Sequence, residues 1–205
     1  NTAIVQSDSK WIAFLDSDDF WHTEKLEKQI KQTKLFPEYK INFTDEIWIR
    51  NGKRVNPKNK HRKREGWIFK PSLDLCLMAP STVMLRRELL EKHGMFDESL
   101  PACEDYDLWL RLTAYHPVAL QNEKLMIRHG GHSDQLSKKF WGIDRFRVQS
   151  LQKILTQENL RSGDRTAAIR MLRKKCKILI KGFRNRGNMK DIRVYQNIAK
   201  KFVDI

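Results

Sequence analysis

The sequence predicts an α/β protein in which a mixed sheet is flanked by helices and followed by a basic helical C-terminal tail. Short apolar segments bounded by polar residues alternate with segments of helical periodicity, which is typical of this class. Helix signals dominate from Gly142 onward. Residues 145–205 hold 17 Lys and Arg against 4 Asp and Glu, a net charge of +13, whereas residues 1–144 have a net charge of +2. We therefore expect a nearly neutral domain over residues 1–144 and a basic tail over residues 145–205.

Composition excludes two classes of protein. The chain has 205 residues, and none of its apolar runs approaches the roughly 20 residues that span a bilayer, so we expect no membrane-spanning segment. Cys76, Cys103 and Cys176 are odd in number and far apart, which excludes a disulfide framework and a thiolate zinc site and favours a reducing, cytoplasmic compartment. The N-terminus has neither Met nor a signal-peptide pattern, so we expect an internal fragment or a processed chain.

The expected elements can be followed along the chain. Lys10–Leu15 is short and apolar, as in a buried strand, and Thr23–Leu35 has helical spacing with Thr23 as its expected N-cap. Arg87–His93 is expected to be a short helix that ends at Gly94. The other expected elements are strands at Ile41–Arg50, Pro80–Arg86, Val118–Leu120 and Lys124–Arg128, a polar basic loop at Lys53–Glu65, and helices at Asp105–Tyr115 and Thr166–Phe183.

Three carboxylates directly follow the first expected strand. Asp16, Asp18 and Asp19 lie at the carboxyl end of that strand, where α/β sheets bind ligands. A cation among them would relieve their mutual repulsion, and hard oxygen ligands suit Mg²⁺ or Mn²⁺, which are usually shared with substrate phosphates. The residues therefore predict a diphosphate bridged by a metal. The alternative is that they turn the chain and cap the following helix.

Two further segments carry candidate residues. Glu104 and Asp105 stand just before an amphipathic helix, where they either cap the helix or provide a general base that takes a proton from an attacking hydroxyl. His129 and His132 flank two glycines. One of these imidazoles would add a nitrogen ligand to the carboxylate site, and the alternative is an ordinary surface loop.

Together these segments resemble family 2 glycosyltransferases of the GT-A fold. The stretch NTAIVQSDSKWIAFLDSDDFWHTEKLEKQI is similar to the family's W-I-A-F-L-D-S-D-D-x-W block. The stretch PSTVMLRRELLEKHGMFDESLPACEDYDLWLRL is similar to a second block, in which a G-x-F-D-E loop and an E-D pair lead into D-L-W-L-R. The resemblance covers residues 1–137 and implies a GT-A-like (Rossmann-like) sheet. It also implies that residues 1–144 are the C-terminal part of such a domain, since the family carries roughly 80 further residues before the position of Asn1.

The resemblance implies a donor site for a nucleotide-diphosphate sugar. Asp16 and Asp18 match the D-x-D element that holds the ribose and the diphosphate, the latter through a divalent cation, Mn²⁺ or Mg²⁺. Asp19 matches the family's extra Asp. His129 or His132 matches a histidine that helps to bind the metal or the diphosphate in some relatives, and we keep both as candidate metal ligands beside Asp18.

The resemblance also implies the reaction. Asp105 matches the catalytic base and Glu104 its acidic neighbour, and Trp109 in the same block is expected to contact substrate. Asp105 would deprotonate the acceptor hydroxyl, which attacks the anomeric carbon from the face opposite the nucleotide, so that the transfer inverts configuration. The metal offsets charge on the leaving diphosphate. The expected acceptor is a saccharide or a lipid-linked saccharide in cell-envelope or exopolysaccharide synthesis.

Other functions stay open at the level of the sequence. Acidic residues around a metal also suit a nucleotidyl or phosphoryl transferase. The charge of residues 145–205 suits a non-catalytic nucleic-acid-binding module, but the aromatic platform of single-strand binders is missing, so nucleic acid is the less favoured partner.

The tail also has two interpretations. Its apolar stripe packs on the domain or lies on an anionic membrane, which would place the protein at the inner face of the membrane. The stripe consists of Ile169, Leu172, Cys176, Leu179 and Phe183.

Overall fold

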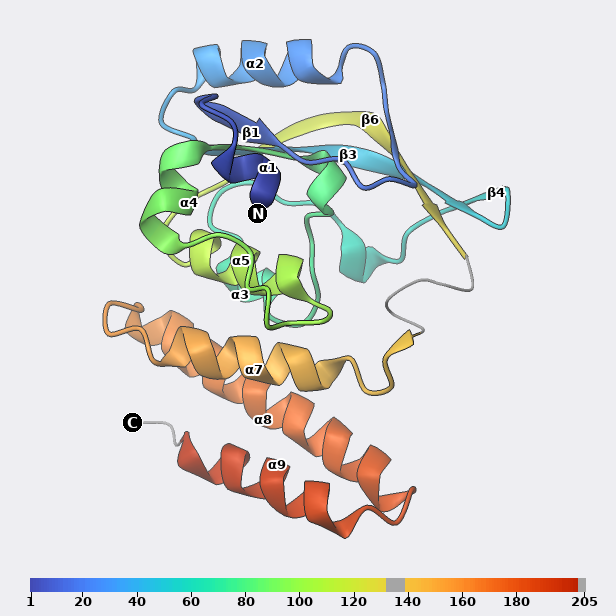
Figure 1. The fold of residues 1–205 in the computed structure, drawn as a ribbon, viewed down its shortest axis with the longest axis vertical. Coiled ribbons are helices and arrows are strands. Elements are labelled where there is room, and N and C mark those ends of the chain that lie inside the picture. Colours follow the sequence, from blue (N-terminus) through green and yellow to red (C-terminus); the bar gives the residue numbers. More distant parts are fainter. Residues whose placement is uncertain (132–138, 203–205) are drawn as a thin grey trace.

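A mixed sheet of six strands forms the centre of the first part of the chain. The computed structural model describes residues 1–131 and 139–202 (Figure 1). The strands follow the order β1-β5-β3-β6-β2, and β4 pairs with β3 outside this path. β3 and β6 are parallel and the other pairs are antiparallel. The strands are β1 (Trp11–Ala13), β2 (Phe20–Trp21), β3 (Ile41–Arg50), β4 (Lys53–Val55), β5 (Val83–Arg86) and β6 (Ala119–Gly130).

Helices lie on both sides of this sheet, which confirms the predicted fold class. α2 covers one face and α5 lies beyond the other, and α7, α8 and α9 follow as a stack below α5 in Figure 1. Short 3-10 turns, η1 (Asn59–His61) and η2 (Pro80–Thr82), occur in the connections. The α-helices are α1 (Thr2–Val5), α2 (Lys25–Leu35), α3 (Phe69–Ser72), α4 (Arg87–His93), α5 (Glu104–Thr113), α7 (Asp144–Leu155), α8 (Ser162–Arg184) and α9 (Met189–Lys201).

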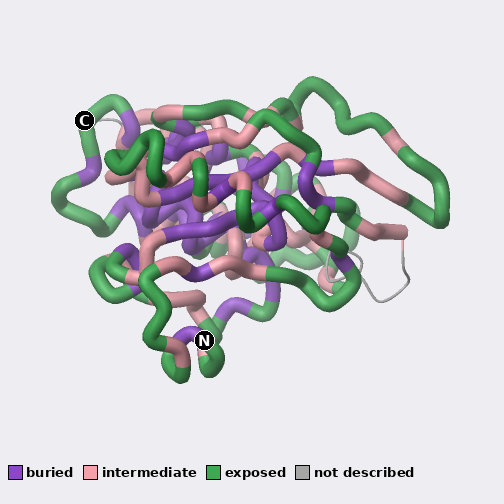
Figure 2. The backbone as a smooth tube through the Cα atoms, turned by 90° about the horizontal axis from the view of Figure 1, so that it is seen from above, coloured by how far each residue is buried: buried purple, intermediate pink, exposed green. Residues whose placement is uncertain are grey.

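The helix α5 lies between two hydrophobic cores. Leu108 and Leu112 pack in the core beneath the sheet, together with Phe43 of β3. Tyr106 and Leu110 pack in the second core, which the helices beyond α5 share. Residues 106–113 of this helix are all buried, and Figure 2 shows the buried segments gathered in the interior of the molecule. The N-terminus of α5, which carries the acidic pair, therefore has a rigid support on two sides.

The tail packs on the domain as a continuation of its core. The second core joins α3 and α5 to the apolar sides of α7, α8 and α9. Leu172 and Cys176, in the middle of the predicted stripe, are completely buried, and all five stripe residues are buried. The structure thus supports the packing interpretation of this stripe, and its apolar side is not available to a membrane. No helix in the two described ranges is long and apolar enough to cross a bilayer.

Several element boundaries differ from those expected. α2 begins at Lys25 with Glu24 at its N-cap position, so the prediction that Thr23 caps this helix is wrong. The segment from Pro80 starts as a 3-10 turn before β5, because Pro80 has no N–H to give to a strand ladder. The two short strands expected over residues 118–128 form one strand, β6, whose register against β3 shifts at Thr44/Asp45 and Asp45/Glu46.

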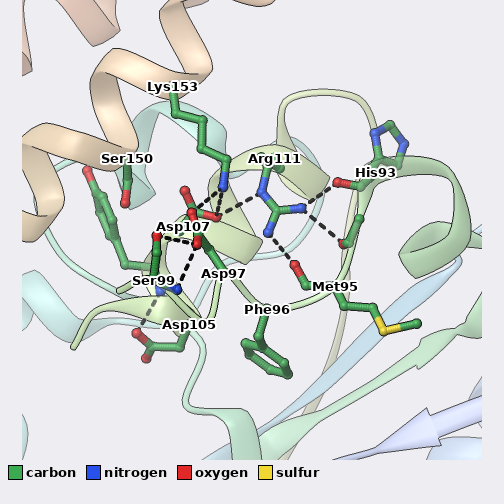
Figure 3. A network of polar contacts seen from close by, with 12 residues as sticks. His93, Met95, Phe96, Asp97, Ser99, Asp105, Asp107, Arg111, Ser150 and Lys153 are labelled. Atoms are coloured by element: carbon green, nitrogen blue, oxygen red, sulfur yellow. Dashed lines mark hydrogen bonds and ion pairs between the residues drawn. The ribbon is translucent and has the colours of Figure 1, made fainter. Parts of the chain in front are cut away.

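A buried polar network ties α5 to its neighbours (Figure 3). Asp107 is 1% exposed and accepts hydrogen bonds from Arg111 Nε at 2.9 Å and from Lys153 Nζ of α7 at 3.1 Å. The Arg111 guanidinium also donates to backbone carbonyls of the loop after α4, including Met95 O at 2.7 Å, and Lys153 reaches Asp97 at 2.8 Å. Because every charge here has a partner, the network fixes the loop that leads into the acidic pair.

Candidate active site

One cavity brings the two acidic segments together. It has a volume of about 790 Å³, and Asp16 and Asp18 line it together with Glu104 and Asp105. Asp16 and Asp18 come from the loop between β1 and β2, whereas the other pair opens α5, some 90 residues later in the chain. The central expectation from the sequence, that distant carboxylates share one cleft, agrees with this geometry.

Ser81 holds the Asp16–Asp19 loop in place. Its Oγ accepts a hydrogen bond from the Asp16 backbone N–H at 3.0 Å and donates to Asp19 Oδ2 at 2.7 Å. Its carbonyl accepts from Trp21 Nε1 at 2.7 Å. Since Ser81 is completely buried on η2, these three bonds anchor both ends of the acidic loop to the body of the sheet.

Asp19 stabilises the acidic loop by hydrogen bonds and does not line the cavity. It is 7% exposed. Besides Ser81, it accepts a hydrogen bond from the His129 backbone N–H at 3.1 Å and so links the loop to the end of β6. Burial raises the pKa of Asp19, while these hydrogen bonds lower it. Asp19 thus holds the loop in place from outside the cavity lining, and its contact with substrate stays a prediction.

The acidic pair lies at the N-terminus of α5, where the helix dipole favours negative charge. Burial and the nearby charges of Asp105 and Asp16 raise the pKa of Glu104. The residue before the pair, Cys103, has a φ of 64°, a left-handed conformation that is uncommon outside glycine. This turn directs Glu104 and Asp105 to the cavity from the first turn of a buried helix.

Of the two candidate histidines, His129 lies in the described part of the chain and His132 does not. His129 lines the cavity, and its ring packs edge-on against Phe20 at a centroid distance of 5.1 Å. Its Nδ1 is buried and has no hydrogen-bond partner among the described residues. His132 lies outside the described residues, so its role as a metal ligand stays a prediction.

Trp109 does not reach the cavity, and the expectation that it contacts substrate is corrected. It is 2% exposed and packs in the core beneath the sheet, with Phe14 at 6.1 Å and Phe96 at 6.3 Å between ring centroids. The second turn of α5 faces inward here, so this side chain stabilises the helix that carries the acidic pair.

Part of the remaining cavity wall is basic or aromatic, and sequence reasoning missed these residues. Trp48, Arg50 and Arg128 line the cavity from the paired strands β3 and β6, and Lys63 reaches it from the loop after β4. Arg147 enters from α7 in the tail. The i, i+2 spacing of Trp48 and Arg50 on a strand was an available signal, because alternate side chains share one face. Nothing in the sequence pointed to Arg147.

A divalent cation fits the acidic end of the cavity if substrate supplies part of its ligands. In residues 1–131 and 139–202, no three His, Cys, Asp or Glu side chains are grouped to hold a metal by themselves. Mg²⁺ is commonly held by one or two carboxylates together with substrate phosphates, and Asp16 and Asp18 are such a set. Burial and the charges of Asp19 and Asp18 raise the pKa of Asp16, which marks an excess of negative charge that a cation would relieve.

Comparison with known proteins identifies the first part of the chain. A family model described as "Glycosyl transferase family 2" matches residues 1–94, which include the acidic loop and Ser81. This segment belongs to glycosyl transferase family 2. The structure of Staphylococcus aureus TarS (residues 1–349 with UDP-GlcNAc) superposes with a TM-score of 0.68 at 15% identity, covering 98% of this chain and 59% of that one. That likeness shows the fold, which is the GT-A-like α/β sheet that the sequence predicted.

The curated relatives of this chain include a protein of polysaccharide biosynthesis. An Escherichia coli protein described as "UDP-Glc:alpha-D-GlcNAc-diphosphoundecaprenol beta-1,3-glucosyltransferase WfgD" is 33% identical over 60% of this chain and 46% of its own length. The amylovoran biosynthesis glycosyltransferase AmsE of Erwinia amylovora is 28% identical over 73% of this chain and 56% of its own length. The chain thus spans about half the length of these two relatives.

We expect Ser81→Ala to destabilise the protein by about 1–3 kcal/mol, because Oδ2 of the buried Asp19 carboxylate loses its hydrogen-bond donor. The Asp16 N–H loses its acceptor in the same variant. Urea unfolding measures the change. Ser17→Ala, an exposed neighbour in the same loop, is the control and should cost less than about 0.5 kcal/mol. Equal costs for the two variants would contradict the anchoring role of Ser81.

Proposed function

We propose that this chain belongs to an inverting glycosyltransferase that moves a sugar from a nucleotide-diphosphate sugar to an acceptor hydroxyl, with residues 1–144 as the C-terminal part of its GT-A-like domain. The observation that carries the proposal is the shared cavity of Asp16, Asp18, Glu104 and Asp105. A donor that carries a diphosphate needs a cation or basic groups, and an acceptor hydroxyl needs a base. This cavity has residues for both, within a segment of family 2.

At the donor end, Asp16 and Asp18 would hold the ribose and the cation that binds the diphosphate. Mn²⁺ or Mg²⁺, when bound there, offsets the negative charge that develops on the leaving diphosphate. Arg128 also lines this cavity, and its charge lowers the pKa of both Asp16 and Asp19, which indicates that its guanidinium lies near the acidic loop. It therefore contributes positive charge close to the diphosphate. His129 remains a candidate ligand.

At the acceptor end, Asp105 is the proposed general base. It takes the proton from the acceptor hydroxyl, whose oxygen attacks the anomeric carbon as the bond to the diphosphate breaks on the opposite face. Glu104 has a raised pKa and keeps its proton to higher pH, so that it repels the charge of Asp105 less. The buried body of α5 fixes the base against displacement, which preserves the geometry needed for proton transfer.

A lipid-linked saccharide is the proposed acceptor class, with the protein at the inner face of the membrane. Two curated relatives are named for a diphosphoundecaprenol-linked substrate. The apolar stripe of α8 is buried, so contact with anionic headgroups would use the exposed basic side of this helix, which includes Arg170 and Lys177. This arrangement supports loose, salt-sensitive attachment in place of insertion.

A donor panel tests the proposed function directly. The protein that carries this chain is mixed with nucleotide-diphosphate sugars, with and without Mn²⁺, and donors are ranked by the rise in melting temperature. The best donor is then offered to a sugar acceptor, and NMR gives the anomeric configuration of the product. We expect stabilisation that needs Mn²⁺ and a product inverted at the anomeric carbon. Retained configuration, or a preference for nucleoside triphosphates over all sugar donors, would contradict the proposal.

A further inference from the structure

The cavity has a second, positively charged region that the proposed chemistry does not use fully. We call it the hairpin wall and define it as Trp48, Arg50, His61 and Arg128, all of which line the cavity. The Cζ atoms of Arg50 and Arg128 lie 5.7 Å and 5.8 Å from the centroid of the Trp48 ring. The His61 ring packs edge-on against the same indole, with centroids 4.9 Å apart. One aromatic side chain thus organises three groups that can bind an anion.

The segment that carries His61 is fixed to the cavity by a buried ion pair. Lys63 Nζ donates to Glu46 Oε1 at 2.6 Å and to the carbonyl of Leu77 at 2.7 Å. The two side chains are 9% and 2% exposed. Burial raises the pKa of Glu46, but the charges of Lys63 and Arg128 help to lower the net pKa below its usual value, so this carboxylate stays charged. The predicted basic loop is therefore anchored at this point, and Arg128 interacts with Glu46 as well as with the acidic loop.

The two guanidiniums of the hairpin wall make no ion pair with any residue of the described ranges. Neither Arg50 nor Arg128 has a carboxylate within salt-bridge distance there, although the same cavity holds four carboxylates at its acidic end. Guanidinium binds phosphate oxygens in a bidentate manner, which makes Arg the usual residue for recognising phosphate. The donor diphosphate is already matched by the cation at Asp16 and Asp18 and by Arg128. Arg50 is exposed and is the guanidinium of the hairpin wall that can bind a second anionic group.

We propose that the hairpin wall binds a phosphate or diphosphate carried by the acceptor, and that Arg50 is its principal contact. The inference rests on the proposed function and names the group by which the same site selects its acceptor. Arg50 is the last residue of β3, next to the turn to β4, and belongs to a different segment of the chain from the donor carboxylates. The apolar ring of Trp48 excludes water from one side of the site, and the lower local dielectric strengthens the interaction between the bound anion and the flanking guanidinium.

Inorganic pyrophosphate in the presence of EDTA is a suitable probe, because a donor-type diphosphate site needs a divalent cation and the hairpin wall does not. Isothermal titration calorimetry compares the unmodified protein with Arg50→Gln, Asp18→Asn and the control Arg54→Gln. Arg54 lies on β4 opposite Ile49, is exposed and does not line the cavity. We expect Arg50→Gln to weaken pyrophosphate binding about tenfold, because the variant loses one charged pair of hydrogen bonds to the anion. The other two variants should stay within about twofold.

Three outcomes would overturn the inference. Absence of binding without metal, or loss of binding in Asp18→Asn, would assign the anion to the donor end. Equal weakening in Arg50→Gln and Arg54→Gln would assign it to general surface charge. The NMR signal of His61 in the unmodified protein gives a check that is independent of variant folding. Burial and the charges of Lys60 and Lys63 lower the pKa of His61, and a bound anion should raise it.

Measurement of transfer activity with two acceptors separates this inference from the proposed function. Arg50→Gln should raise KM about tenfold for a glycosyl diphosphate acceptor, with kcat unchanged, and leave KM for the neutral alkyl glycoside of the same sugar unaltered. Equal effects on the two acceptors would overturn the phosphate subsite while leaving sugar transfer intact. Absence of transfer to both acceptors, with metal-free pyrophosphate binding retained, would instead count against the proposed function.

Discussion

An Asp105→Asn variant is expected to lose between about 10²- and 10⁴-fold in turnover while keeping its affinity for the nucleotide sugar. Asn cannot accept the proton of the acceptor hydroxyl, but it has nearly the same size and keeps the polar contact at the start of α5. Asp105 lines the same cavity as Asp16 and Asp18 but comes from α5, whereas those two come from the loop after β1. Steady-state transfer assays together with nucleotide binding by calorimetry measure the two effects separately.

The control for this variant is Glu91→Gln, which removes an exposed carboxylate from α4. It should leave both turnover and binding within about twofold, since exposed charges contribute little. If Asp105→Asn keeps normal turnover, Asp105 is not the base. If it loses donor binding to the same extent as turnover, its role is to bind the donor, and the division of the cavity into two ends is wrong.

An Asp18→Asn variant is expected to lose nucleotide binding that depends on Mn²⁺. Mutation of a residue that only hydrogen-bonds to a metal ligand lowers metal affinity roughly 10- to 100-fold. Replacement of the charged ligand itself by an amide should lower the affinity at least as much. The effect belongs to Asp18 because it lines the cavity, while Asp19 in the same loop is buried against Ser81. Calorimetric titration with UDP, in Mn²⁺ and in EDTA, measures it.

Asp8→Asn is the matched control for Asp18→Asn. Asp8 is an exposed carboxylate just before β1 and is absent from the cavity lining. It should bind UDP and Mn²⁺ as the unmodified protein does. Binding of UDP by Asp18→Asn that still responds fully to Mn²⁺ would remove Asp18 from the metal site.

Much of the fold could be predicted because it depends on local patterns. The apolar segment around Trp11–Ala13 and the amphipathic repeat of α8 specify a strand and a packed helix by composition and spacing alone. The single strand β6 could not be predicted. The register of β6 against β3 shifts next to Glu123. Glu123 forms an ion pair with Lys28 of α2 at 2.6 Å. A partner from such a distant segment leaves no local signal in the sequence.

The acidic part of the site was predictable and the basic part was not. Asp16 and Asp18 follow a strand, and Glu104 and Asp105 open a helix, so their position at the ends of these elements already indicates a ligand site. Lys63 lies in a run of basic residues that reads as a solvated loop, and its burial depends on Glu46, 17 residues earlier. Trp109 shows the opposite error, because a side chain within a functional block was taken for a contact although the helix turns it into the core.

A crystal structure of the complex with UDP and Mn²⁺ tests the central claim most directly, because the anomalous signal of manganese locates the cation without reference to the refined atoms. We expect one strong anomalous peak beside Asp18, with the UDP diphosphate on the same cation and the Asp105 carboxylate facing the vacant sugar position across the cavity. A manganese peak away from Asp18, or a nucleotide bound outside the cavity that holds Asp105, would contradict the account.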